Sequence, residues 1–381
     1  MNGKPETGPD AANGINELSF FPKCGSGPGL LLLADGNVPE TSVLARARLF
    51  SEEGYVVHTL LTAPGASDIG SVATQLSDRS EITGGLVCVA HGDAVLAGLE
   101  AADRFDAIVG FDATPEISKD INLANLPCPI VFQFGTLNAP ESAATAEKLS
   151  GNLDSLNGDR VYAWPEAAPG FSLPGHAAFD SRVDSLAHSR TLETIRRVIG
   201  PHYDYVALFA EHIRHEFNTR DVDSTMATMI DAPYVNHVAT LAGGVGHDML
   251  KRFYKYHFVE QNSRDRSSVT VSHTLGPDRL VLELVVRFKH DQVLDRYFPN
   301  IEPTGEYAEL ATVLIVKFRG DKVCHEHIYW DQGSALKQIG VLDTGDLPVA
   351  GAEAARKVLD ERLPSNIFMQ NAWSTSDGKP I

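Results

Sequence analysis

The sequence predicts a doubly wound α/β domain followed by an α+β domain. The length of 381 residues exceeds one ordinary domain. Up to about residue 200, continuous apolar runs alternate with helical stretches, as in a parallel sheet that is buried on both faces. After about residue 269, strands follow one another with little helix between them, as in an antiparallel sheet that helices cover on one face.

The first domain is expected over residues 25–200. Its predicted strands are the apolar runs at residues 29–34, 55–61, 85–90, 107–111 and 129–134. Its predicted helices have amphipathic periodicity and lie at residues 40–53, 71–79, 93–103, 140–151 and 181–199. Residues 1–24 have no apolar h-region, so we expect a flexible N-terminal arm and not a signal peptide.

The second domain is expected over residues 201–370, because the periodicity changes at Gly200-Pro201. Helices are predicted at residues 203–218, after Asp221 and at residues 246–258. Strands are predicted at residues 269–274, 279–290, 308–319 and 322–330. The segment Arg319-Gly-Asp-Lys322 is typical of a hairpin turn, and residues 371–381 are expected to form a flexible tail.

Composition narrows the classes of function. The 32 Lys and Arg residues against 50 Asp and Glu residues give a net charge of −18, which disfavours nucleic acid and anionic lipid as partners. No apolar stretch approaches the roughly 20 residues of a membrane helix. The four cysteines form no CxxC pair, so we expect no zinc ribbon and no redox motif. These features predict a cytoplasmic protein.

Four segments of the first domain resemble the dienelactone hydrolase branch of the α/β-hydrolases, at residues 28–36, 49–57, 84–94 and 126–135. The resemblance implies a nucleophile on a G-x-C-x-G-G turn. Ala90 occupies that position in Cys88-Val-Ala-His-Gly-Asp93, and Asn138 and Pro169 occupy the positions of the acid and the histidine. A methyl group cannot attack a carbonyl and proline cannot accept a proton, so we expect a pseudo-hydrolase.

An alternative hypothesis is that the first domain still hydrolyses lactones or esters, as a carboxymethylenebutenolidase does. Cys88, His91 and His176 are the residues that could form a non-standard catalytic constellation. Each also has an ordinary structural interpretation: a small core residue, a residue at a helix start and a solvated loop histidine.

Three segments of the second domain resemble the SnoaL-like polyketide cyclases, which share a cone-shaped α+β fold with ketosteroid isomerase. They are residues 234–248, residues 298–305, and residues 325–331 leading into 336–340. Members of this group include aldol cyclases, isomerases, dehydratases, epoxide hydrolases and non-catalytic binding proteins. The resemblance implies an open cone and a homodimer, without choosing among these activities.

Titratable groups on the predicted strands are the candidates for acid–base chemistry. His290 shares an otherwise apolar strand face with Leu280, Leu282, Leu284, Val286 and Phe288. Asp295 lies close enough in sequence to orient its ring. On the last strand, Glu326 lies on one face, with His325 and His327 on the other, and the sequence does not decide which face is inside. The pair His325 and His327 lacks a completing carboxylate motif, so no metal is expected.

The segment Tyr234-Val-Asn-His237 provides the remaining candidates. His237 is interpreted as a catalytic or substrate-orienting group at the rim of the cone, or else as a loop histidine bonded to backbone. Tyr234 and Asn236 are candidate substrate-binding residues. His212, His215, Tyr254, Tyr256 and His257 are expected to be helix-surface or packing residues.

The leading hypothesis is a cofactor-free enzyme that cyclises, isomerises or dehydrates a carbonyl-containing, polyketide-like substrate. Its catalytic residues would be His237, His290, Asp295 and either Glu326 or His327. The alternatives are the lactone or ester hydrolase of the first domain and a non-catalytic binding protein.

Overall fold

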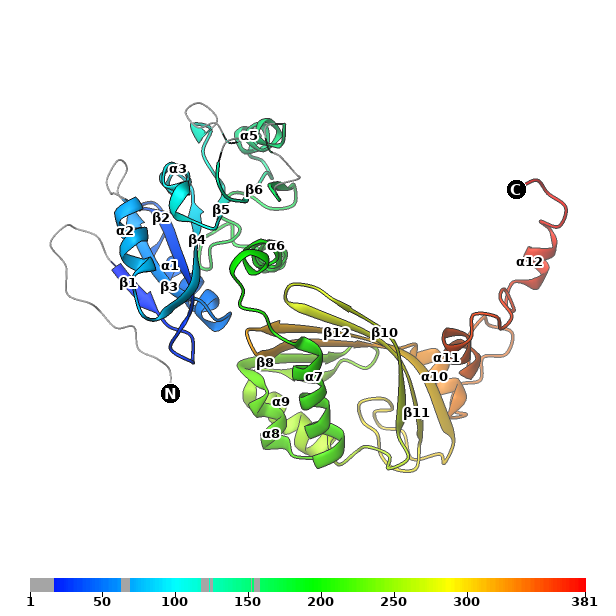
Figure 1. Ribbon diagram of the computed structural model, residues 1–381. Helices are drawn as coiled ribbons and strands as arrows, with labels where there is room; N and C mark the ends of the chain where they lie inside the picture. Colours follow the sequence, from blue (N-terminus) through cyan, green and yellow to red (C-terminus); the bar gives the residue numbers. More distant parts are fainter. Residues whose placement is uncertain (1–16, 63–68, 118–122, 124–125, 152, 154–157) are drawn as a thin grey trace. The chain divides into compact units, whose positions relative to one another are not determined.

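The computed structural model describes residues 17–62, 69–117, 123, 126–151, 153 and 158–381. It divides the chain into two compact units, Met1–Tyr203 and Asp204–Ile381 (Figure 1). Among the described helices, none has both the length and the apolar character that crossing a membrane requires.

The first unit is built on a seven-stranded sheet with the order β1-β3-β2-β4-β5-β6-β7. Neighbouring strands are parallel except at the edge, where β1 is antiparallel to β3. The strands are β1 (Glu17–Phe20), β2 (Gly27–Asp35), β3 (Val56–Thr62), β4 (Ile82–His91), β5 (Ala107–Phe111), β6 (Ile130–Gly135) and β7 (Arg160–Trp164). Every residue of β2 is buried, as a central strand covered on both faces requires.

Helices cover both faces of this sheet and create two apolar cores. One core contains side chains of α1 (Glu40–Glu52) and α6 (Ser181–Ile199). The other contains side chains of α2 (Ile69–Ser77), α3 (Ala94–Glu100) and α5 (Pro140–Ser150), and the short helix η2 (Ala102–Arg104) follows α3. The predicted doubly wound architecture is therefore confirmed.

Part of the predicted N-terminal arm is wrong. Glu17–Phe20 forms β1, because its backbone pairs with β3 and the side chain of Phe20 enters the apolar core that α1 also contacts. Residues 1–16 of that arm lie outside the described residues.

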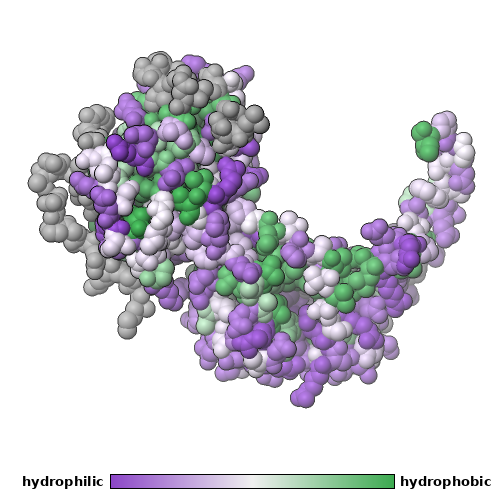
Figure 2. Space-filling view, viewed as in Figure 1, coloured by the Kyte–Doolittle hydropathy of each residue, from purple (hydrophilic) through white to green (hydrophobic). Residues whose placement is uncertain are grey.

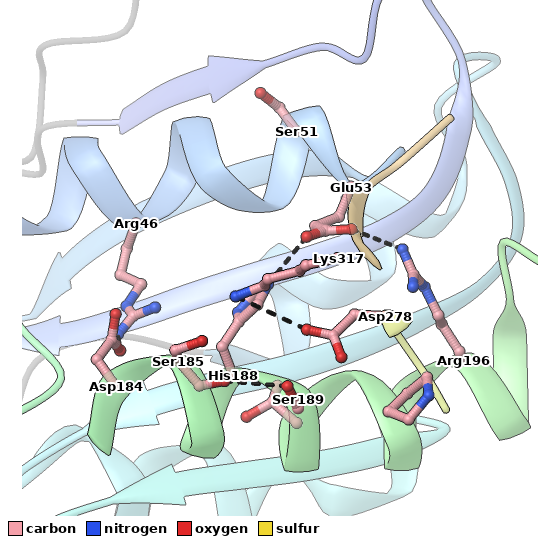
Figure 3. A network of polar contacts seen from close by, with 12 residues as sticks. Arg46, Ser51, Glu53, Asp184, Ser185, His188, Ser189, Arg196, Asp278 and Lys317 are labelled. Carbon is pink, nitrogen blue, oxygen red and sulfur yellow. Dashed lines mark hydrogen bonds and ion pairs between the residues drawn. The ribbon is translucent and has the colours of Figure 1, made fainter. Parts of the chain in front are cut away.

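A buried ion cluster joins α1 to α6 (Figure 3). Glu53 follows the last turn of α1 and is 1% exposed. Its carboxylate oxygens accept hydrogen bonds from Nε2 of His188 at 3.1 Å and Nη2 of Arg196 at 2.7 Å. Both partners belong to α6, so one carboxylate holds the two helices of the same layer together.

The second unit is built on a curved six-stranded sheet with the order β10-β11-β12-β13-β8-β9. Only β13 and β8 are parallel. The strands are β8 (Met229–His237), β9 (Ala242–Val245), β10 (Ser267–Leu275), β11 (Arg279–Lys289), β12 (Tyr307–Arg319) and β13 (Lys322–Tyr329). Arg319 pairs with Lys322, which confirms the predicted hairpin turn.

Helices lie on one side of this sheet (Figure 1). They are α7 (Tyr205–Arg214) with the π-helical turn η5 (His215–Thr219), α8 (Val222–Ala227), and α9 (His247–Phe253) with the π-helical turn η6 (Tyr254–Phe258). Three further helices follow the sheet in sequence: α10 (Gln332–Gln338), α11 (Ala352–Leu359) and α12 (Gln370–Ser374). Alternate residues of β12 are buried, so the sheet has one covered face and one half-exposed face.

Three features of the second unit bear on the sequence analysis. The side chain of Asp331 accepts a hydrogen bond from the backbone of Ser334, which confirms its interpretation as a helix N-cap. The strand β8 was not expected, because Asp231, Pro233 and Asn236 obscure its alternation. Part of the predicted flexible tail is helical, since α12 covers Gln370–Ser374, although all of its residues are exposed.

The Glu53 cluster should be the main polar contribution to the stability of the first unit. Glu53→Gln removes the charge that compensates Arg196 and His188 in a buried site, so we expect it to lower the free energy of unfolding by about 3 kcal/mol or more. Scanning calorimetry should show a lower melting temperature. Glu147→Gln, at an exposed position, is the matched control, and equal melting temperatures for the two variants would contradict the assignment.

Candidate active site

The cone of the second unit encloses a cavity of about 260 Å³. Its apolar floor is formed by Leu280, Leu282, Leu284 and Val286, which share one face of β11 as the sequence predicts. Its charged lining residues are Glu216, Arg266, Arg296 and Glu326. An apolar cavity with a few convergent charged groups is the usual form of a small-molecule site.

A histidine on α7 lies between two carboxyl groups at the wall of this cavity. Nε2 of His212 is 3.1 Å from Oε1 of Glu216, one helical turn later, and 3.2 Å from Oε1 of Glu326 on β13. His212 is completely buried, and both carboxyl groups are nearly so. The cluster therefore joins a helix to the sheet through charges that water does not reach.

The other ring nitrogen of His212 carries a hydrogen. Nδ1 is 2.6 Å from Oγ1 of Thr228, whose own hydrogen is donated to the carbonyl oxygen of Thr225. The hydroxyl can therefore only accept from Nδ1. Burial alone would lower the pKa of His212, but the charges of Glu216 and Glu326 raise it to about 10. The ring is accordingly an imidazolium at neutral pH.

The carboxyl group of Glu326 lines the cavity and shares the ring of His212 with Glu216. A single Nε2–H of His212 can point to only one oxygen, and the hydrogen bond goes to Glu216. Oε1 of Glu326 lies beside the ring without a hydrogen-bond donor. Burial raises the pKa of Glu326, against the opposing charge of His212. A carboxyl group of this kind can take up and return a proton of a bound molecule.

Tyr254 on η6 completes this polar end of the cavity. It lines the cavity, and its hydroxyl oxygen is 3.5 Å from Nε2 of His212. Burial and the charges of Glu216 and Glu326 raise the pKa of Tyr254 well above its usual value. The hydroxyl therefore keeps its hydrogen, and the carboxylate of Glu216 accepts it.

His237, one of the predicted catalytic residues, lines the cavity as a neutral ring. Nδ1 donates to the carbonyl oxygen of Ala242 at 3.1 Å, so Nε2 is an acceptor. Burial and the charge of Arg296 lower the pKa of His237 to about 3. The ring can accept a hydrogen bond from a ligand, but it is a poor base near neutral pH.

His290 and Asp295 do not form the expected pair. Nδ1 of His290 is 3.2 Å from Oγ1 of Thr304, and its ring packs on Phe298 and does not line the cavity. The carboxylate of Asp295 instead accepts from Nδ1 of His257 at 2.8 Å and from Gln261. The predicted strand face is right, but the cavity ends at Val286, before His290 is reached.

The outer face of the sheet holds three other predicted site residues. The ring of Tyr234 packs edge to face on those of His325 and His327. Val235 and His237 line the cavity, so the alternating residues Tyr234 and Asn236 point away from it. The assignment of Tyr234, Asn236 and His327 to a site inside the cone is therefore wrong, and of the two faces of β13 it is the one with Glu326 that is inside.

Sequence reasoning did not single out Glu216, and it placed His212 and Tyr254 on helix surfaces or in packing. A signal was present on the first helix: Tyr205, Phe209 and His212 form its buried stripe, and Glu216 continues it. A histidine and a glutamate four residues apart on an apolar stripe have to be paired or functional, because burying them unpaired is costly.

The same cluster is where a cation could be held. Among the described residues, donor atoms of His212, Glu216 and Glu326 come within 4.8 Å of one another. A ring that binds a metal through Nε2 has to be uncharged there, whereas the two carboxylates favour the imidazolium. His325 and His327 place their Nε2 atoms 3.0 Å apart but bring no carboxylate into such a group.

The first unit does not assemble a hydrolase site from its described residues. Ala90 is completely buried inside β4, and the positive φ of this turn is at Gly92. Cys88 shares the face of Ala90 and packs beside Gly98 of α3. His91 lies on the opposite face and stacks on Phe111.

The residues proposed for the alternative hydrolase site are also unsuited to catalysis, because of their protonation states or their hydrogen bonds. Burial raises the pKa of the Cys88 thiol and lowers the pKa of His91 to about 3, so neither forms a reactive ion. Nδ1 of His176 accepts a hydrogen bond from the backbone of Ala178. The side chains of Cys88 and His91 are separated by the sheet, so the alternative site proposed from the sequence is not formed.

Comparisons with known proteins were made at the level of sequence and of structure. No family model and no curated protein matches the sequence. A candidate dienelactone hydrolase from Klebsiella pneumoniae subsp. pneumoniae MGH 78578 aligns over 48% of this chain and 93% of its own, at 15% identity and a TM-score of 0.42.

Two further solved structures are similar to smaller parts of the chain. A candidate SnoaL-like polyketide cyclase from Jannaschia sp. CCS1 aligns over 38% of this chain and 100% of its own, at 14% identity and a TM-score of 0.30. An NTF2-like protein of unknown function from Burkholderia pseudomallei K96243 aligns over 36% and 99%, at 15% identity and a TM-score of 0.29. The sheet topology itself bears out the fold class that the sequence predicts, a largely parallel α/β sheet followed by an α+β unit on a mostly antiparallel sheet.

The protonation state of His212 can be observed directly. Nitrogen NMR of histidine-labelled protein should show both ring nitrogens of His212 protonated between pH about 6 and about 8, where an ordinary histidine titrates. Because the folded pKa is raised, this group stabilises the fold fully below about pH 6.5, and the stabilisation is lost as pH rises through about 10. A ring that loses its proton near pH 6.5 would contradict the assignment.

The first unit should not regain hydrolysis from a single nucleophile. Position 90 is completely buried within a strand, so Ala90→Ser should hydrolyse p-nitrophenyl acetate no faster than the unchanged protein. Labelling by a fluorophosphonate probe provides a second readout. Turnover or labelling that appears only in the Ala90→Ser variant would show that a base and an accessible elbow are present after all.

Proposed function

We propose that the protein is a cofactor-free enzyme that moves protons on a small carbonyl compound inside the cone. The observation that supports this most is the position of Glu326, a buried carboxyl group whose Oε1 has no hydrogen-bond donor and which lines an apolar cavity. The reaction class is isomerisation, cyclisation or dehydration of a polyketide-like molecule, since each of these begins with transfer of a proton next to a carbonyl group.

Five side chains have roles in the proposed reaction. Glu326 removes a proton from the carbon next to the carbonyl group and returns it at another atom. Tyr254 turns its hydroxyl hydrogen from Glu216 to the substrate oxygen on which negative charge develops. His212 stays protonated beside Glu326 and favours its ionised form, while Glu216 holds the ring in place. His237 accepts a hydrogen bond from a substrate hydroxyl through Nε2.

The size of the cavity limits the substrate. Its volume of about 260 Å³ is below the roughly 300–1,000 Å³ of pockets for drug-sized ligands. The substrate is therefore compact, with one or two rings. The first unit, with its triad positions occupied by Ala90, Asn138 and Pro169, has a structural role in this proposal.

Location and assembly are further parts of the proposal. A cytoplasmic location agrees with the acidic composition, and the homodimer is proposed from the resemblance of the second domain to SnoaL-like cones. The visible face in Figure 2 has green hydrophobic patches among hydrophilic ones. Neither a membrane nor a nucleic acid is proposed as a partner. Analytical ultracentrifugation would give the oligomeric state.

Proton exchange tests the chemistry without knowledge of the natural substrate. Compact cyclic ketones and β-keto acids incubated with the protein in D₂O should exchange the hydrogens next to the carbonyl group, followed by proton NMR. Glu326→Gln should lower the exchange rate about a hundredfold or more, because a general base typically contributes that much.

Glu302→Gln is the matched control, since Glu302 is exposed and does not line the cavity. It should leave the exchange rate unchanged. Circular dichroism would verify that both variants are folded. Equal rates in the unchanged protein and in a folded Glu326→Gln variant would refute the role of Glu326.

A further inference from the structure

Two arginines line the cavity that contains Glu326. Arg296 follows Asp295 in the segment between β11 and β12, and Arg266 lies immediately before β10. Arg296 is 2% exposed, although a guanidinium group is strongly favoured to remain in water or to pair with an acid.

Aromatic rings surround these guanidinium groups. The guanidinium carbon of Arg296 is 4.3 Å from the ring centre of Phe258 and 4.7 Å from that of Tyr297. The guanidinium carbon of Arg266 is 4.0 Å from the ring centre of Phe217, which Arg296 also approaches, at 5.5 Å. Cation–π contacts hold both groups in place, but they do not neutralise the charge.

The acidic groups nearby are engaged elsewhere. Asp295 bonds to His257 and Gln261, and Glu216 bonds to His212. Among the described residues Arg296 forms no ion pair, and its Nη1 has no hydrogen-bond partner. It shares a side-chain hydrogen bond with Tyr297, and the charge of Glu216 acts on it without direct contact. A buried guanidinium group that no carboxylate contacts is unfavourable, which indicates that an acidic ligand supplies the missing contact.

The charges of the cavity do not balance. His212, Arg266 and Arg296 provide three positive charges, and Glu216 and Glu326 provide at most two negative ones. This local excess occurs in a chain with a net charge of −18, so it is not a consequence of overall composition. The excess is a property of the cavity itself.

We propose that the cavity binds a compact apolar molecule that has one carboxylate group, which pairs with the guanidinium of Arg296. A planar carboxylate matches the fork of a guanidinium with two parallel hydrogen bonds. The leucine floor of β11 accommodates the hydrocarbon part of the molecule, and Glu326 then faces its reactive part. Only the identification of this ligand as the substrate, a carbonyl-containing carboxylic acid, rests on the proposed function.

Binding of matched probes tests this assignment. Isothermal titration of the full chain with benzoate, trans-cinnamate and 2-naphthoate, and with the corresponding neutral amides, should show that at least one acid binds about a hundredfold more tightly than its amide. Arg296→Gln should lower the affinity for that acid by a similar factor, because the ion pair is desolvated. Arg252→Gln, at an exposed position of α9, should leave the affinity unchanged.

Two results would overturn the proposal. One is equal affinity for an acid and its amide, or absence of acid binding at millimolar concentration, in the unchanged protein, a comparison that needs no variant. The other is full affinity for the acid in a folded Arg296→Gln variant. The two proposals can fail separately. Glu326→Gln should still bind the acid, so unchanged proton exchange in this variant would refute only the proposed chemistry. Unchanged acid binding in Arg296→Gln would refute only the proposed carboxylate site.

Discussion

A carboxyl group buried in an apolar cavity needs a charged or hydrogen-bonding neighbour, and His212 is that neighbour for both Glu216 and Glu326. The other features of the candidate site follow from this contact. It joins α7 to β13, it directs Nδ1 toward Thr228, and it leaves one oxygen of Glu326 without a donor. If the histidine were neutral, both carboxyl groups would lose the cation that lies directly beside them.

The backbone around the cluster is adapted to the same purpose. Both π-helical turns, η5 and η6, end with an i to i+5 hydrogen bond, from Arg220 to His215 and from Val259 to Tyr254. Each turn contributes cavity residues, among them Glu216 and Tyr254. Single π-helical turns often occur at functional sites, because the extra residue changes which side chains face inward.

The two histidines at the cavity differ in protonation state, because different charges lie beside them. His212, beside two carboxylates, is held protonated, whereas the charge of Arg296 and burial keep His237 neutral. Acid–base groups and a cationic group thus line one apolar cavity. This arrangement suits a ligand with a charged part and a reactive part, held by a hydrocarbon frame.

In the first unit, buried polar groups have a structural role, unlike those of the cavity in the second unit. The methyl group of Ala90 belongs to an apolar core, and Cys88 packs in that same core. Its main buried polar cluster, Glu53 with His188 and Arg196, joins two helices. Here the polar groups serve the fold, and in the second unit they are the candidates for chemistry.

The sequence alone determined the features that depend on local periodicity. Continuous apolar runs predicted the parallel sheet, and alternation predicted the inward face of β11. Alternation also separated Glu326 from His327, but both faces of β13 contain titratable groups, so it could not identify the inner one.

Only the tertiary structure decided which residues meet. His212 and Glu326 belong to elements far apart in the sequence, and no periodicity links a helix at the start of the cone to its last strand. The structure likewise ended the cavity at Val286, which leaves His290 outside, and it paired Asp295 with His257 and not with His290. Periodicity is a property of one element, whereas pairing and cavity limits depend on how several elements pack.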